Sequence, residues 1–187
     1  MVELDVRRRG DDLIVFHGGP PGRPTPQMSR SDARRPALQA VLEHINGRIA
    51  VDLELKEPGY ERDVVSLALR YVSPDSLLIT SFLDEAVRAA HRSAPQIATG
   101  LIVGRDPRKH GLVPAISDVF PFRRVAEVDA DFLAPSHVLD ITGIRARAAR
   151  RGIPLLLWTV NDANKLERAL RDRRLLGVVT DRFTRSR

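Results

Sequence analysis

Short apolar runs typical of β-strands recur along the 187-residue chain, and segments with helical spacing separate most of them. The strand-like runs cover 2–6, 13–16, 48–55, 76–81, 98–103, 130–135, 153–160 and 176–181. Apolar residues at helical spacing predict helices over 36–45, 61–72, 83–94, 141–152 and 162–173, with a further helix near 115–128. Strands that alternate with helices of about ten or more residues predict a parallel α/β fold.

Two parallel architectures fit this pattern, a doubly wound sheet and a (β/α)8 TIM barrel. No glycine-rich phosphate loop follows the first strand, as a dinucleotide-binding fold would need. Polar residues also stand at the carboxyl ends of several strands, where barrel active sites are assembled. We therefore favour a TIM-barrel type α/β fold over 1–187, as a single domain. With the run at 13–16 set aside as a hairpin extension, the count is seven core strands, one short of a barrel.

The composition excludes several kinds of site. The chain has no cysteine, so disulfides, thiolate metal sites and a cysteine nucleophile are ruled out. The formal net charge is +6, but the basic residues form short scattered runs without interleaved aromatic residues, so we expect no nucleic-acid partner. No signal peptide and no apolar run of membrane-spanning length is visible. We expect a cytoplasmic protein without a transmembrane segment.

Two of the predicted strands carry carboxylates on one face. Because side chains alternate along a strand, Glu3 and Asp5 share one face of the first run. Asp52 and Glu54 share a face of the third run, and Lys56 follows on the same side. Buried unpaired carboxylates are costly, and a hard divalent cation such as Mg²⁺ or Ca²⁺, which prefers oxygen ligands, would remove that cost. The other interpretation is neutralisation by arginines, or exposure on an edge strand.

Three further side chains at strand ends are candidates for a site. His17 follows the hairpin run, and near neutral pH an imidazole can act as a general acid or base. Lys56 could hold a phosphate oxygen as a point charge, or pair with a neighbouring glutamate. Trp158 ends an apolar strand and could line a pocket or only cap the core. Asp162 is predicted to be the N-cap of the helix that follows.

Five segments, taken in order, resemble the glycerophosphodiester phosphodiesterase family over essentially the whole chain: VELDVRRRGDDLIVFH, VDLELKEPG, ITSF, LLLWTVND and GVVTDR. The resemblance implies a (β/α)8 barrel that hydrolyses glycerophosphodiesters to glycerol 3-phosphate and an alcohol with a divalent metal ion. It also implies that Glu3, Asp5 and Glu54 are the metal ligands.

The resemblance assigns roles to the other candidates as well. His17 matches the second of the family's two catalytic histidines, Lys56 matches a lysine that accompanies the third carboxylate, and Trp158 matches a pocket-lining aromatic residue. The implied reaction is attack of the glycerol 2-hydroxyl on phosphorus, which gives a cyclic phosphate that water then opens. The two histidines exchange the roles of general base and general acid.

The sequence departs from the family pattern at its start. The family begins with a strand ending in His-Arg-Gly, a segment with a glutamate, and a helix, and this sequence has no counterpart of them. We therefore expect weakened activity, since loss of a general acid or base costs roughly 10²–10⁴-fold in rate. Three explanations are open: a true start upstream of Met1, a naturally shortened homologue, or a homodimer that covers the open barrel edge.

Other functions also remain open at this point. A catalytically impaired homologue would bind phosphodiesters or anionic lipid headgroups without turnover. Sphingomyelin-cleaving lyases share the acidic pattern, so sphingomyelin or a lysophospholipid is an alternative substrate to a small-molecule glycerophosphodiester.

Overall fold

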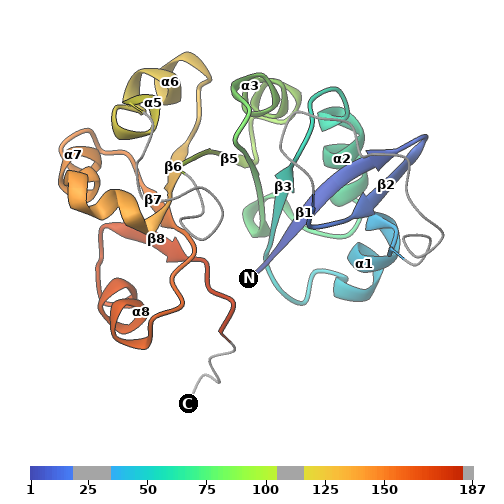
Figure 1. Ribbon diagram of the computed structural model, residues 1–187. Coiled ribbons are helices and arrows are strands. Elements are labelled where there is room, and N and C mark those ends of the chain that lie inside the picture. Colours follow the sequence, from blue (N-terminus) through green and yellow to red (C-terminus); the bar gives the residue numbers. More distant parts are fainter. Residues whose placement is uncertain (19–34, 105–115, 183–187) are drawn as a thin grey trace. The chain divides into compact units, whose positions relative to one another are not determined.

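The computed structural model of the chain describes residues 1–18, 35–104 and 116–182. The chain divides into two compact units: Met1–Leu101 with Val128–Ala130, and Ile102–Glu127 with Asp131–Arg187. Figure 1 colours the first unit mainly blue to green and the second mainly yellow to red. One domain over 1–187 therefore stays a prediction.

Parallel strands and helices alternate in the first unit, as the sequence predicts. The elements are β1 (Val2–Arg9), β2 (Asp12–Val15), α1 (Leu38–Ile45), β3 (Val51–Leu55), α2 (Glu61–Ala68), the 3₁₀ helix η2 (Pro74–Ser76), β4 (Leu77–Ser81), α3 (Asp84–Ser93) and β5 (Ala98–Val103). β1, β3, β4 and β5 are parallel neighbours in this order, and β2 is antiparallel to β1.

The predicted hairpin is present between β1 and β2 (Figure 1). Gly10 takes a φ of 57° in its turn, a left-handed conformation that suits glycine. β2 pairs with the carboxyl-terminal half of β1, and the returning chain continues until the Phe16 N–H donates to the Asp5 carbonyl over 2.9 Å. The hairpin thus returns the chain to the level of Asp5, just before His17.

The sheet of the first unit has an apolar face and a polar face. The apolar face packs against α1, α2 and α3, in a buried core that includes Leu38, Leu42, Leu53, Leu55, Val64, Ile79 and Ala86. The opposite face carries Glu3, Asp5, Asp52, Glu54 and Thr80. Alternation along each strand produces both faces, and burial of the apolar face fixes the register.

A buried ion pair lies at the carboxyl end of β1. Arg7 is 1% exposed and pairs with Glu57. The Tyr60 hydroxyl lies 2.8 Å from the Val6 carbonyl oxygen and 2.8 Å from Glu57 Oε2, and it accepts a hydrogen bond from the Glu57 N–H. These contacts fasten the turn that follows β3 to β1.

The second unit contains α5 (Ile116–Val119), α6 (Phe122–Glu127), β6 (Phe132–Pro135), the 3₁₀ helix η3 (His137–Thr142), α7 (Ile144–Ala149), β7 (Leu155–Leu157), α8 (Ala163–Leu170) and β8 (Leu175–Val178). β6, β7 and β8 are parallel. The predicted N-cap of α8 is confirmed, because Asp162 accepts a hydrogen bond from the Lys165 N–H over 2.8 Å.

Two predicted helices are divided in the structure. The segment 141–152 begins within η3 and becomes α7 only after Gly143, whose φ of 68° interrupts the helix. The segment near 115–128 forms α5 and α6, with Pro121 between them, because a proline disfavours helical geometry in the residue before it. No helix in the described ranges is both long enough and apolar enough to cross a membrane.

We predict that Tyr60→Phe lowers the free energy of unfolding by about 1–3 kcal/mol, because the buried Glu57 N–H loses its acceptor. Tyr71→Phe is the matched control. Its hydroxyl bonds to Glu43 at the surface, so we expect a change within about 0.5 kcal/mol. Denaturant melts of both variants measure the difference, and equal losses would contradict the role given to Tyr60.

Candidate active site

Four carboxylates and one ammonium group gather on the polar face of β1 and β3. The parallel register places Glu3 beside Asp52 and Asp5 beside Glu54. Lys56 follows β3 directly and is 7% exposed. Its Nζ atom lies 2.5 Å from Asp5 Oδ1 and also pairs with Glu54. One buried cation therefore faces four acidic groups.

The structure brings together the three residues predicted as metal ligands. Single carboxylate oxygens of Glu3, Asp5 and Glu54 all lie within 4.8 Å of one another. Glu3 Oε1 is buried and has no hydrogen-bond partner in the described part of the chain. Since Mg²⁺ and Ca²⁺ bind oxygen at about 2.0–2.6 Å, oxygens at this spacing can share one ion after small side-chain movements. The orphaned oxygen and the all-oxygen donor set both fit a hard divalent cation.

Burial controls the protonation of the cluster. It raises the pKa of Glu3 to about 9, and repulsion from Asp5 and Glu54 adds to the effect. Burial also raises the pKa of Glu54 to about 7, although Lys56 opposes the rise. Two of the candidate ligands thus tend to hold protons near neutral pH until a cation displaces them.

Asp5 and Lys56 remain ionised for the opposite reason. Burial alone would raise the pKa of Asp5, but attraction to Lys56 and His17 outweighs burial and holds the pKa below its ordinary value. Burial likewise disfavours the Lys56 ammonium, but Glu54 and Asp5 outweigh it and raise the pKa of the lysine. The ionised Asp5 carboxylate and the ionised Lys56 ammonium therefore lie next to each other in the site.

His17 lies at the edge of this cluster. Its side chain is 74% exposed, and its Nδ1 atom pairs with Asp5 Oδ2. If Nδ1 carries the hydrogen that Asp5 accepts, the Nε2 atom of a neutral ring is the proton acceptor. The hairpin of β1 and β2 creates this arrangement, because it carries the chain back to Asp5.

Asp52 and Thr80 form a part of the site that the sequence analysis did not assign. Asp52 is 2% exposed and accepts a hydrogen bond from Thr80 Oγ1 on β4 over 2.8 Å. Burial raises the pKa of Asp52 to about 6, although the Thr80 bond opposes the rise. The sequence placed Asp52 on the acidic face, but nothing in the spacing of residues pointed to Thr80. Only the strand register, which sets Thr80 beside Glu54, reveals it.

Trp158 belongs to the second unit. It is half-buried, its Nε1–H donates to the Ala134 carbonyl over 2.8 Å, and its backbone bridges to Ser136 beyond β6. These contacts fix the indole at the carboxyl ends of β6 and β7. Its predicted place in a substrate pocket stays a prediction.

Comparison with known proteins points to one family, although no family model matches the chain. A curated glycerophosphodiester phosphodiesterase of Caldanaerobacter subterraneus subsp. tengcongensis is 25% identical over 209 residues, which cover 96% of this chain and 81% of the relative. The predicted resemblance to the glycerophosphodiester phosphodiesterase family is confirmed by this relative.

Solved structures agree with the predicted fold. A phosphodiesterase of Oleispira antarctica in complex with the product sn-glycerol-3-phosphate has a TM-score of 0.71 at 22% identity, over 96% of this chain and 80% of the other. A glycerophosphodiester phosphodiesterase of Parabacteroides distasonis has a TM-score of 0.70 at 18% identity, over 96% and 78%. The α/β fold of TIM-barrel type is thereby confirmed.

We predict two effects of Glu3→Gln on the metal-free chain. The folded pKa of about 9 lies above the ordinary value of 4.5. Glu3 therefore favours the folded state fully below about pH 4.5, and this contribution is lost as the pH rises towards about 9. The variant should be more stable than the parent at about pH 8, and its stability should fall less between about pH 5 and pH 8.

If Glu3 is a metal ligand, calcium should stabilise the parent and the same substitution should abolish that stabilisation. Thermal unfolding with and without calcium chloride measures both effects. Glu167→Gln, at an exposed pair with Arg171, is the control and should change neither. An unchanged calcium shift in Glu3→Gln would contradict the metal site.

Proposed function

We propose that this chain is a divalent-metal-dependent phosphodiesterase that hydrolyses glycerophosphodiesters to glycerol 3-phosphate and an alcohol. The observation that carries the proposal is the convergence of Glu3, Asp5 and Glu54 on neighbouring parallel strands, with Lys56 beside them. The curated relative with the corresponding name supports the reaction class. The Oleispira antarctica complex supports glycerol 3-phosphate as the product.

Glu3, Asp5 and Glu54 are the proposed ligands of a Mg²⁺ or Ca²⁺ ion. With all groups ionised, Glu3, Asp5, Asp52, Glu54 and Lys56 would carry a formal charge of −3, since four negative charges face one positive charge. Such an excess would repel an anionic phosphodiester. A bound divalent ion would offset it and polarise the phosphoryl oxygens.

Lys56 is proposed to bind the phosphate of the substrate. Its ammonium group has three N–H donors and is held by Asp5 and Glu54. When these carboxylates turn to a cation, the lysine can offer its donors to a phosphate oxygen. Because Lys56 is buried, solvent screens this attraction little.

His17 is proposed to transfer a proton during the reaction. Its pairing with Asp5 favours the tautomer with Nε2 available as a base, and holds the ring beside the cluster. In the proposed reaction the glycerol 2-hydroxyl loses its proton as its oxygen attacks phosphorus. The bond from phosphorus to the alcohol oxygen breaks, and that oxygen takes up a proton. Water then attacks the resulting cyclic phosphate, the bond from phosphorus to the 2-oxygen breaks, and that oxygen takes up a proton to give glycerol 3-phosphate. Trp158 is proposed to line the pocket for the alcohol.

We expect His17→Ala to lower the release of glycerol 3-phosphate from glycerophosphocholine by roughly 10²–10⁴-fold. His44→Ala is the control. His44 is exposed on α1, so this substitution should leave the rate of glycerol 3-phosphate release unchanged. The assay uses the purified chain with calcium or magnesium, and chelation of the metal should abolish turnover. Full activity in His17→Ala would refute the assignment. Binding of glycerophosphocholine without turnover would instead identify a phosphodiester-binding homologue.

We also propose that turnover by the chain is weak, because the sequence contains no His-Arg-Gly motif to supply the second histidine. Free imidazole can replace a missing acid–base group, so added imidazole should raise the turnover of the parent chain at fixed pH. N-methylpyrrolidine, which has no imidazole ring, is the control for ionic strength. Fast turnover that imidazole does not increase would contradict the proposal that a second acid–base group is missing.

A homodimer and a cytoplasmic location complete the proposal. β2 pairs with β1 only from Val6 to Arg9, and no described strand pairs with Val2–Leu4 on that side. An open strand edge invites pairing with another chain. Sedimentation velocity measures the oligomeric state.

Sphingomyelin and lysophosphatidylcholine, offered in the same hydrolysis assay, test the alternative lipid substrates.

A further inference from the structure

We propose that the second unit carries a surface that binds anionic lipid bilayers, formed by α5, η3 and α7. Three of its large apolar side chains are exposed: Ile116 at 82%, Phe120 at 65% and Ile141 at 85%. Ile116 lies on α5, Phe120 follows α5 directly, and Ile141 lies on η3, which contacts α5. Large exposed apolar side chains on elements that contact each other are candidates for an interaction site.

One arginine on α7 and another just after it contact aromatic rings of this surface. The Arg147 guanidinium lies 5.2 Å from the ring centre of Phe120 and 5.4 Å from that of Phe122, and it also donates to the Val119 carbonyl. Arg151 lies 4.5 Å from the Phe122 ring centre. Figure 1 shows α5, α6 and α7 grouped within the second unit. Cations over aromatic rings thus fasten α7 to α5 and α6.

The surface carries an excess of positive charge. Some of its arginines are neutralised, in the pairs Arg123–Glu127, Arg124–Asp118 and Arg145–Asp140. Arg147, Arg150 and Arg151 form no ion pair with a carboxylate among the residues that the structure describes. In the part of the chain that the structure describes, Arg147 lies against Phe120 and Phe122 without a carboxylate partner, and the exposed Arg150 and Arg151 follow α7 directly.

This combination matches the interface of an anionic bilayer. Apolar side chains enter the boundary between headgroups and acyl chains, while arginines bind lipid phosphates. A symmetric dimer through this surface would bring the same arginines against each other, so like charges would oppose it. The proposal does not depend on the proposed hydrolysis.

Co-sedimentation of the full chain with vesicles tests the apolar part. The parent should bind vesicles of phosphatidylcholine and phosphatidylglycerol, and bind much less to phosphatidylcholine alone. The double variant Ile116→Asn, Ile141→Asn should lose about tenfold or more in partitioning to the anionic vesicles. The control is Leu170→Asn, Leu176→Asn, which changes side chains that are 63% and 55% exposed elsewhere in the same unit. It should bind like the parent.

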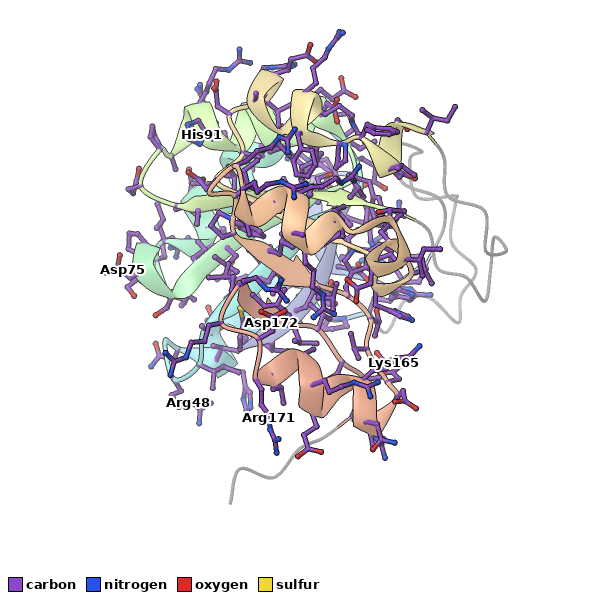
Figure 2. The ribbon with its side chains drawn as sticks, turned by 90° about the vertical axis from the view of Figure 1, so that its left-hand side faces the viewer. Arg48, Asp75, His91, Lys165, Arg171 and Asp172 are labelled. Carbon is purple, nitrogen blue, oxygen red and sulfur yellow. The ribbon has the colours of Figure 1, made fainter. Side chains whose placement is uncertain are left out.

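A second pair of variants tests the charge. Arg150→Gln, Arg151→Gln should weaken binding to anionic vesicles by about fivefold per arginine at low salt. Arg168→Gln, Arg171→Gln removes the same formal charge from α8, where Figure 2 shows Arg171, and should weaken it much less. Circular dichroism melts of all four variants establish that each is folded.

Three results would overturn the proposal. The first is that the parent does not bind anionic vesicles at low salt. The second is that the control variants lose as much binding as the test variants. The third is a stable dimer in sedimentation velocity that Ile116→Asn, Ile141→Asn dissociates, since the surface would then bind a second copy of the chain.

Discussion

The free-energy cost of removing carboxylates from water determines how the charged residues of the first unit are arranged and protonated. Asp5, Asp52 and Glu54 are buried, Glu3 is half-buried, and Lys56 is the cation that pairs within the group. Water would solvate these groups better than the protein does, so the metal-free fold keeps them close only by holding protons on some of them. An arrangement that lowers stability without a ligand favours a function that uses the charge.

Hydrophobic packing on the apolar face of the same strands offsets the cost of burying these carboxylates. Leu53 and Leu55 alternate with the acids along β3 and lie in the core beneath α2 and α3. A slip of one residue in register would exchange the two faces and bury the acids among the helices. The register that places Asp5 beside Glu54 is therefore enforced by hydrophobic packing on the opposite face.

The sequence was sufficient for the parts of the site that depend on local periodicity. Alternation placed Glu3 with Asp5 and Asp52 with Glu54, and the run at 13–16 was correctly predicted to form a hairpin. The partnership of Asp52 with Thr80 was not readable, because it depends on the register between β3 and β4. Helix boundaries failed at Gly143 and at Pro121 for a related reason: the helical spacing of apolar residues continues through a local backbone interruption.

Asp5 contacts both Lys56 and His17 and is one of the three candidate metal ligands. It is the only candidate ligand whose pKa is lowered, because Lys56 and His17 both contact its carboxylate. Glu3, Asp5 and Glu54 would hold a divalent cation in the proposed site, and binding it would require Glu3 and Glu54, whose pKa values burial raises to about 9 and about 7, to lose their protons. The Asp5 carboxylate contacts His17 through Oδ2 and Lys56 through Oδ1. The proposed metal site and the proposed catalytic histidine therefore share Asp5, so a change in the position of its side chain affects both.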